Sequence, residues 1–243
     1  MRKIYTVLVI ILMCLAGILP SRAFAAVSNE DATARYSKII NCYRNYIIRR
    51  DDKEGALEDL LVKLSYELNI DLDSNDDEKA YELECSFEIL VYEPGAKLGY
   101  ALYDINKDGV PELFILTEDH TILAIYSLID DAPVLVGAYW SRNRCAMDKT
   151  GTLYIHASSG ASDSYSASYS FSSGGELNLT EMVGVESFDE QGNAFPEPQY
   201  YRIVNGKKLI VNEEEAVSAW RKFPDVYSDN PTKDAGLNFV PFS

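Results

Sequence analysis

Residues 98–116, LGYALYDINKDGVPELFIL, place a polar insert, DINKDGVPE, between two short apolar runs. Each run is bounded by turn-forming residues, which predicts a strand at about 98–103 and another at about 112–117. Asn, Asp and Gly in the insert favour a reversal of the chain between them. The stretch therefore restricts this part of the chain to a strand, an oxygen-rich loop and a second strand.

The insert carries side-chain oxygens at alternate positions, which is the spacing of a metal-binding loop. Counted from Asp104, they stand at positions one, three, five and nine, and the glycine at position six permits a left-handed backbone turn. Several hard oxygen donors suit Ca²⁺ better than Mg²⁺, which keeps its waters, or Zn²⁺, which prefers nitrogen and sulfur. The predicted calcium ligands are Asp104, Asn106, Asp108, Val110 through its main-chain carbonyl, and Glu112.

The loop is not an EF-hand, because an EF-hand requires a glutamate at position twelve and flanking helices. Position twelve here is Ile115, inside the second apolar run. The stretch resembles instead the calcium loop of FG-GAP and VCBS-type repeats, Asp-x-Asp/Asn-x-Asp-Gly-x-x-Asp/Glu between strands, in the single-loop form found in secreted Firmicutes proteins of unknown function. The resemblance covers residues 98–116 of 243. It implies a calcium site between strands, but neither the propeller of multi-loop repeat proteins nor a reaction.

Two readings of the loop stay open in the sequence. It is either this calcium site or an ordinary Asn/Asp/Gly turn that exposes its polar side chains. If calcium binds, we expect the ion to join the strands rather than to take part in chemistry. A second oxygen-rich run, IDLDSNDDE at residues 70–78, lacks the glycine and the later carboxylate and predicts a solvated linker.

The beginning of the chain has the organisation of a secretory signal peptide. Two basic residues precede an apolar run at residues 7–19, and Ala-Phe-Ala at 23–25 provides small residues for cleavage. We expect a signal peptide over residues 1–25, a bacterial protein that is secreted or held at the cell surface, and no membrane span after cleavage. Lipidation at Cys14 is disfavoured, because Met13 stands where a small residue is needed.

The mature chain is strongly acidic. Removing residues 1–25 takes away Arg2, Lys3 and Arg22 and no acid, so the formal net charge falls from -16 to -19. Such a chain is repelled by nucleic acid and anionic lipid and attracts cations. No nucleic-acid partner is therefore expected.

Three cysteines remain after the predicted signal, Cys42, Cys85 and Cys145, without a Cys-x-x-Cys spacing. They allow at most one disulfide, and the sequence leaves open whether any two pair. The fold is therefore not expected to depend on a disulfide framework, and a cysteine zinc site is not indicated.

Hydrophobic periodicity predicts helices first and strands afterwards. Apolar residues recur at helical spacing over about 30–50 and 54–68, and from 81 to 92 they alternate, which favours a strand over a helix. A capping pattern at Asn212 to Glu215 predicts a short helix over about 213–222. The remaining predicted strands cover residues 98–103, 112–117, 121–128, 133–140, 152–157, 165–172, 177–185 and 199–211, the last with an Asn-Gly hairpin signal.

These elements predict a single α+β domain over residues 26–243. Its N-terminal amphipathic helices, at about 29–70, pack on an antiparallel β-meander at about 81–211, and a short C-terminal helix follows. The tail, residues 223–243, has an apolar end that we expect to dock on the body.

Catalytic motifs are not evident. The only histidines are His120 and His156, without an HExxH motif, which argues against zinc hydrolysis. The serines after His156 lack a Gly-x-Ser-x-Gly elbow, and a carboxylate pair for glycoside hydrolysis is a spatial property that the sequence leaves open. We expect a non-enzymatic calcium-binding protein, with a hydrolase as the least favoured alternative.

The main alternative is a binding module. The chain has 17 tyrosines, and the stretch SDSYSASYSFSS alternates serine with tyrosine. Such a strand predicts a sheet face that can hold an extracellular glycan or peptide, although a solvent-facing strand has the same pattern.

Overall fold

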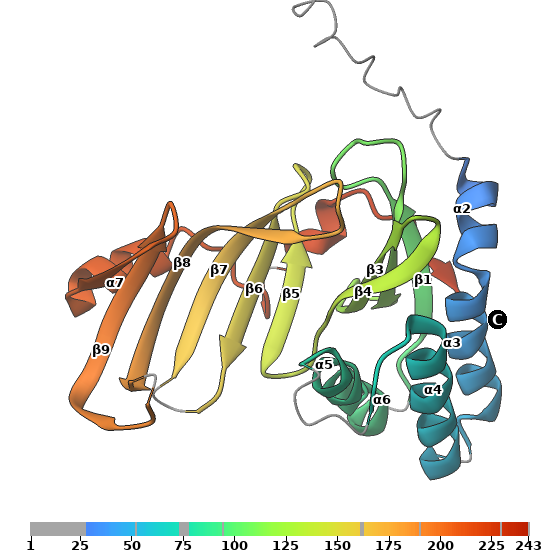
Figure 1. Ribbon diagram of the computed structural model, residues 1–243, viewed down its shortest axis with the longest axis horizontal. Helices are drawn as coiled ribbons and strands as arrows, with labels where there is room; N and C mark the ends of the chain where they lie inside the picture. Colours follow the sequence, from blue (N-terminus) through green and yellow to red (C-terminus); the bar gives the residue numbers. More distant parts are fainter. Residues whose placement is uncertain are drawn as a thin grey trace, which may run out of the picture.

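The computed structural model describes residues 28–51, 53–72, 78–93, 95–160, 163–189, 191–228 and 230–242. The predicted signal peptide and most of the second oxygen-rich run lie outside the described residues. The described chain is an α+β protein with two antiparallel sheets, helices on one side of the first sheet and a short helix against the second (Figure 1). The predicted fold class is confirmed.

The N-terminal helices cover one face of the first sheet. They are α2 (Asn29–Arg35), α3 (Ser37–Arg49), α4 (Lys53–Leu68), α5 (Glu78–Ser86) and α6 (Glu88–Tyr92). Ser28 begins α2 by accepting a hydrogen bond from the Asp31 amide, and Tyr36 separates α2 from α3. The helices predicted at 30–50 and 54–68 are therefore confirmed, the first divided in two. None of the helices in the described chain is long and apolar enough to cross a membrane.

The strand predicted at 81–92 is wrong, because this segment forms α5 and α6. Its apolar residues alternate, but they also recur at the three-to-four spacing of a helix. The helical stripe is the one that is buried: Leu83, Phe87 and Leu90 enter the core, whereas Tyr81 and Val91 are exposed. This short segment fits both the alternation of a strand and the spacing of a helix. Its packing against α4 and sheet A favours the helix.

The first sheet, sheet A, has the strand order β11-β1-β2-β3-β4. Its strands are β1 (Leu98–Tyr103), β2 (Glu112–Thr117), β3 (Ile122–Ile129), β4 (Ala132–Ala138) and β11 (Val240–Pro241). The helices cover the face with Leu113 and Ile115, and the second sheet covers the face with Phe114 and Leu116. Because both faces of sheet A are covered, β2 is buried along its whole length.

The second sheet, sheet B, is a six-stranded meander that follows sheet A. Its strands are β5 (Asn143–Met147), β6 (Leu153–Ser158), β7 (Ser164–Phe171), β8 (Leu177–Phe188), β9 (Ala194–Val204) and β10 (Lys207–Val211). The strand predicted at 199–211 is a hairpin of β9 and β10, and its turn at Asn205 and Gly206 has the positive φ angles that an Asn-Gly turn requires. The sequence does not predict β5.

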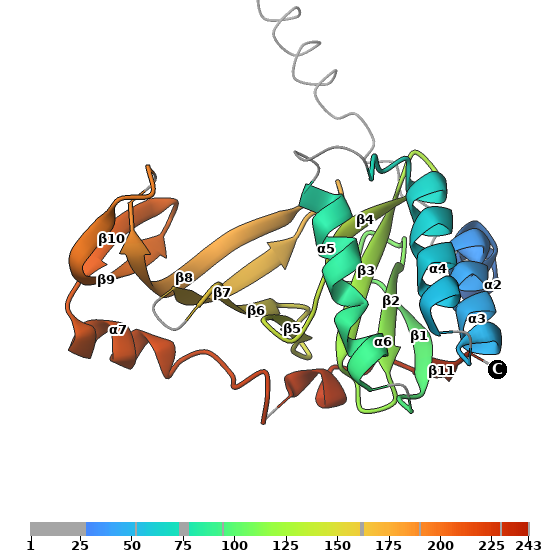
Figure 2. The ribbon, with the colours of Figure 1, turned by 90° about the horizontal axis from the view of Figure 1, so that it is seen from below.

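The short C-terminal helix, α7 (Glu213–Trp220), packs against β8 and β9 on one side of sheet B (Figure 2). The Asn212 side chain accepts a hydrogen bond from the Glu215 amide, and the Glu215 side chain accepts one from the Asn212 amide. The predicted capping box is therefore confirmed.

After α7 the chain returns to sheet A through a short 3-10 helix, η1 (Pro231–Asp234), and β11 pairs with β1. Phe242 is buried, with its ring stacked on those of Tyr43 and Tyr100 at centroid distances of 6.0 and 5.7 Å. The expected docking of the tail on the body is confirmed.

Candidate functional site

The predicted calcium loop joins β1 to β2 at one end of sheet A. Of the five predicted ligands, the loop contains Asp104, Asn106, Asp108 and Val110, and β2 begins with Glu112. Lys107 and Gly109 have positive φ angles of 60° and 90°, so the backbone makes two left-handed steps within the loop. Gly109 adopts this conformation without strain, as its place in the pattern predicts.

The amides of the loop bind its side-chain oxygens. The Asp104 carboxylate accepts hydrogen bonds from the amides of Asp108 (3.1 Å) and Gly109 (2.9 Å). The Asp108 carboxylate accepts one from the Val110 amide (2.9 Å) and one from the Asn106 side chain (2.9 Å). The Asn106 side-chain oxygen accepts one from the Asp108 amide (3.0 Å). The three side chains at alternate positions therefore turn into the loop.

Glu112 is a buried carboxyl group at the base of the loop, with 1% of the residue exposed. It accepts hydrogen bonds from the Ile105 amide (3.0 Å) and the Ser127 hydroxyl (3.4 Å). Burial raises the pKa of Glu112 to about 8, and the neighbouring carboxylates of Asp108 and Asp104 add to the rise. Without a bound cation, Glu112 is therefore mostly protonated at neutral pH, beside the partly buried side chains of Asp104 and Asp108.

The loop also connects sheet A with sheet B. The Asn106 side chain donates a hydrogen bond to the carbonyl of Ser172 in the β7–β8 turn (3.1 Å). The β5–β6 turn contacts the loop at Gly151, where a β-carbon would lie 2.9 Å from the Ile105 carbonyl oxygen. On the helical side, the Tyr36 hydroxyl lies 3.2 Å from the Pro111 carbonyl. Three layers of the molecule therefore meet at this loop.

The loop side chains fit a hard cation in donor type and in charge. A carboxylate oxygen has about two acceptor sites, so one that accepts a single amide hydrogen keeps a site for a cation. Asp104, Asp108 and Glu112 form no ion pair with any lysine or arginine of the described chain. Across the described residues, His, Cys, Asp and Glu side chains alone do not form a metal-binding group of three or more, and the predicted set also uses Asn106 and the Val110 carbonyl.

The two histidines lie at different sheets, His120 beside β2 of sheet A and His156 in β6 of sheet B, and each contacts neighbouring side chains. The His156 ring nitrogen Nδ1 lies 2.9 Å from the Ser166 hydroxyl, a pair that sequence reasoning did not name. Trp220 also donates a hydrogen bond to that hydroxyl (2.7 Å), and Ser166 is buried beneath it. Burial lowers the pKa of His156. His120 lies in the β2–β3 turn, 6.3 Å from the Phe239 ring.

The alternating strand β7 separates its two residue types. Tyr165 and Tyr169 lie on the side that faces α5, and Ser166 lies on the side covered by α7. The tyrosine side borders a groove of about 590 Å³ between α5 and sheet B. The predicted Tyr/Ser strand thus lines a groove with its tyrosines, whereas among its serines Ser166 is buried and Ser170 is exposed.

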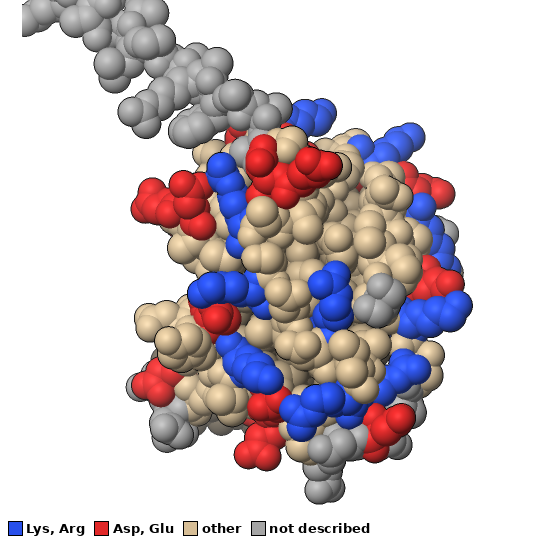
Figure 3. Space-filling view, turned by 90° about the vertical axis from the view of Figure 1, so that its right-hand side faces the viewer, with Lys and Arg blue, Asp and Glu red and all other residues tan. Residues whose placement is uncertain are grey.

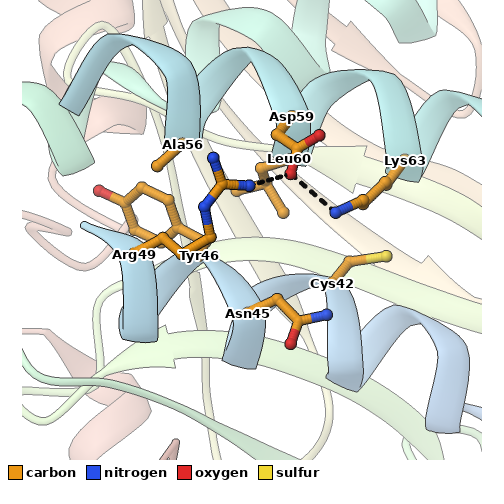
Figure 4. A pocket seen from close by; sticks show the side chains of 8 residues that line it. All are labelled: Cys42, Asn45, Tyr46, Arg49, Ala56, Asp59, Leu60 and Lys63. Atoms are coloured by element: carbon orange, nitrogen blue, oxygen red, sulfur yellow. Dashed lines mark hydrogen bonds and ion pairs between the residues drawn. The ribbon is translucent and has the colours of Figure 1, made fainter. Parts of the chain in front are cut away.

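A hollow between α3 and α4 has a structural explanation (Figure 4). Its volume is about 10 Å³, which holds no more than a water molecule. Asp59 pairs there with both Arg49 and Lys63 and links the two helices. Burial raises the pKa of the Cys42 thiol at its edge to about 11, so the thiol is protonated at neutral pH. The three cysteines of the described chain are all free.

The comparisons with known proteins assign neither a family nor a function to this chain. No protein-family model matches the chain, and no curated protein matches it. A solved structure described as a Xanthomonas type IV secretion system related protein is 16% identical, with a TM-score of 0.27. The alignment covers 47% of this chain and spans 58% of that one. A likeness this weak supports neither a shared fold nor a shared function.

Proposed function

We propose that this is an exported, non-enzymatic protein whose β1–β2 loop binds a structural calcium ion. The observation that carries the proposal is the inward turn of the Asp104, Asn106 and Asp108 side chains within one loop. No lysine or arginine of the described chain forms an ion pair with Asp104, Asp108 or the buried Glu112. A divalent cation bound there would displace the proton of Glu112 and offset the repulsion among the resulting carboxylates. Export rests on the sequence of residues 1–25 alone.

A structural role suits the position of the loop. Asp104, Asn106, Asp108, the Val110 carbonyl and Glu112 would hold the ion, and the ion would supply positive charge at the junction of β1, β2 and the turns of sheet B. The buried Ser166 that contacts His156 lies beneath Trp220, so this pair does not favour a hydrolytic function.

The test is thermal unfolding of residues 26–243 with excess chelator and with calcium. For an extracellular site with a Kd of roughly 0.1 to 1 mM, about 2 mM calcium adds about 0.6 to 2 kcal/mol of stability. The melting temperature should then rise by about 1 to 8 °C in a chain of this size. Asp108→Asn keeps an oxygen for the Val110 amide but loses the charge, so it should remove most of this rise.

The matched control is Asp189→Asn. Asp189 also accepts amide hydrogen bonds within a turn, from Gln191 and Asn193, but it lies in the β8–β9 turn away from the loop. This variant should keep the full response to calcium. An unchanged melting temperature in the parent, together with no heat of calcium binding in calorimetry, would establish the loop as an ordinary polar turn.

The second candidate is a binding module for a peptide or a glycan. The observation that favours it is the groove beside α5, whose lining includes the four aromatic residues Tyr81, Trp140, Tyr165 and Tyr201. Concave sites with several aromatic side chains and a few polar groups are typical of ligand binding. The calcium proposal and this one are independent, because the loop and the groove share no lining residue.

A further inference from the structure

The floor of the groove is a row of residues that crosses sheet B. The register places Tyr165 between Ala157 and Gly184, and Gly184 opposite Tyr201. A β-carbon at residue 184 would lie 2.6 Å from the Tyr201 ring. Tyr201 therefore lies flat over β8, in the space that a side chain at 184 would fill, and extends the aromatic surface begun by Tyr165.

The wall of the groove comes from α5 and from the β4–β5 connection. Tyr81 and Trp140 meet edge to face, with ring centroids 5.9 Å apart and an interplanar angle of 86°. Tyr81 is 61% exposed, so its ring remains available to a ligand. Glu78, three residues before Tyr81 on α5, and Glu82, the residue after it, line the same wall.

The groove is elongated rather than round. A second hollow of about 550 Å³ continues it and shares Glu78, Glu82, Asn143 and Tyr165 with the first. The continuation runs along residues 135–137 of β4, which is an edge strand of sheet A, and reaches residues 175–177 before β8. This length suits an extended chain. The edge of β4 itself is engaged by α5, because the Lys79 ammonium group donates a hydrogen bond to the Val136 carbonyl (2.7 Å).

The lining of the first part of the groove carries four carboxylates, those of Glu78, Glu82, Asp163 and Glu186, against one guanidinium, that of Arg142. Two of these carboxylates are paired, Glu82 with Lys79 and Glu186 with Lys208. Glu78 has no ion-pair partner among the described residues. The groove therefore keeps a negative excess.

The helical face of the molecule differs. There, lysine and arginine side chains alternate with aspartate and glutamate (Figure 3). Pairs such as Lys38–Glu67 and Arg49–Asp59 balance the charges of α3 and α4. We therefore expect a cationic ligand to bind in the groove, where acidic side chains are in excess, rather than on the helical face, where the charges are paired.

At the rim of the groove, the ammonium group of Lys208 is bound by an aromatic ring and a carboxylate, and a cationic ligand could be bound in the same way. Lys208 lies over the Tyr201 ring, 4.6 Å from its centroid, and its ammonium group is 2.6 Å from the Glu186 carboxylate. An aromatic face and a carboxylate together bind one cation here. Tyr81, Trp140 and Glu78 line the wall of the same groove, where Arg142 is the one basic side chain of the lining.

One polar atom of the lining also lacks a partner. The side-chain oxygen of Asn143, which borders both parts of the groove, is buried and accepts no hydrogen bond within the described chain. An unsatisfied buried acceptor costs free energy. The oxygen has almost no accessible surface, so a donor from a ligand would remove that cost only after the Asn143 side chain turns toward the groove. Amide, ammonium and guanidinium groups of a peptide are such donors.

We propose that the groove between α5 and the tyrosine side of sheet B binds an extended peptide segment that carries lysine or arginine. This inference rests on the second candidate function and narrows its ligand class. The negative excess selects a cationic ligand over a neutral glycan, and the aromatic rings bind the flat or cationic parts of basic side chains. The elongated shape of the two joined hollows accommodates an extended chain.

The experiment is calorimetric titration of residues 26–243 at roughly 0.15 M salt, where long-range attraction is largely screened. The probes are an alternating Lys-Ser octapeptide, its Gln-Ser and Glu-Ser counterparts, and a neutral chitin or cellulose hexasaccharide. We expect the Lys-Ser peptide alone to bind. Glu78→Gln should weaken its binding by about threefold to fivefold, and Tyr81→Ala by about twofold to fivefold.

Two variants control for general charge and aromatic effects. Glu84→Gln changes an exposed glutamate on the same helix, and Tyr92→Ala an exposed tyrosine on α6, and neither residue borders the groove. Both should bind the Lys-Ser peptide as the parent does. Tryptophan emission should also change on binding, because Trp140 lines the groove.

Other outcomes overturn the inference in distinguishable ways. Binding of the hexasaccharide but not of the Lys-Ser peptide, with loss in Tyr81→Ala, would keep the groove as a binding site and reject its peptide ligand. Equal weakening by Glu84→Gln and Glu78→Gln would reduce peptide binding to general attraction by an acidic chain. Binding of none of the probes would reject the groove as a site for either ligand class, and the calcium melt would be unaffected.

Discussion

Tyr201 occupies its place over β8 only because residue 184 has no side chain. Gly184→Ala would bring a methyl group within 2.6 Å of the Tyr201 ring and 2.9 Å of the Ser164 carbonyl oxygen. We expect a loss of about 1 to 3 kcal/mol in the free energy of unfolding, measured by urea denaturation. Gly95→Ala is the matched control, since a β-carbon there meets nothing within 4 Å. An unchanged stability in Gly184→Ala would mean that Tyr201 moves freely.

Single residues also show which parts of the site could be predicted. The inward turn of the predicted ligands follows from spacing along a few residues, because a tightly wound loop turns alternate side chains the same way. Asp104, Asn106 and Asp108 accordingly turn inward. The burial of Glu112 and the closeness of Gly184 to Tyr201 depend on strands that pair across the sheet, so no local pattern reveals them.

At the scale of the element, α7 depends on its capping box. Asn212→Ala would leave the Glu215 amide without its side-chain acceptor and remove the bond that the cap contributes. We expect a cost of about 1 kcal/mol, measured by urea denaturation. Asn212→Asp should preserve most of the stability, because its carboxylate accepts the same hydrogen bond and suits a helix N-terminus. Equal stability of the alanine and aspartate variants would contradict a capping role.

Helices and strands that are marked by turn or capping residues in the sequence could be predicted. Those whose structure depends on packing against other segments could not. The bounds of β1 and β2 agree with the prediction because a polar turn separates two apolar runs. Residues 81–92 form helices because a helix buries Leu83, Phe87 and Leu90 together against sheet A. β5 consists of mixed polar and apolar residues, NRCAM, and exists through its pairing with β6. The groove was missed because its wall is α5, which the prediction placed in a strand.

At the scale of the whole molecule, the tail closes the helical core. Phe242 stacks on Tyr43 from α3 and on Tyr100 from β1, so it joins a helix to sheet A. Phe242→Ala should lower the free energy of unfolding by about 3 kcal/mol, measured by urea denaturation. Val240→Ala, at a half-exposed position of β11, should cost less than about 1 kcal/mol. Similar small losses in both variants would mean that the tail contributes little to the core.

The pairing of β11 with β1 also bears on the order in which the chain can fold. Residues 240–241 are the last to emerge during synthesis or translocation among those that complete sheet A. Until they arrive, β1 presents an open edge of unpaired amides and carbonyls, which is a template for joining another chain. A nascent molecule, or one cleaved before residue 240, would therefore be more prone to self-association, because β11 covers this edge of β1.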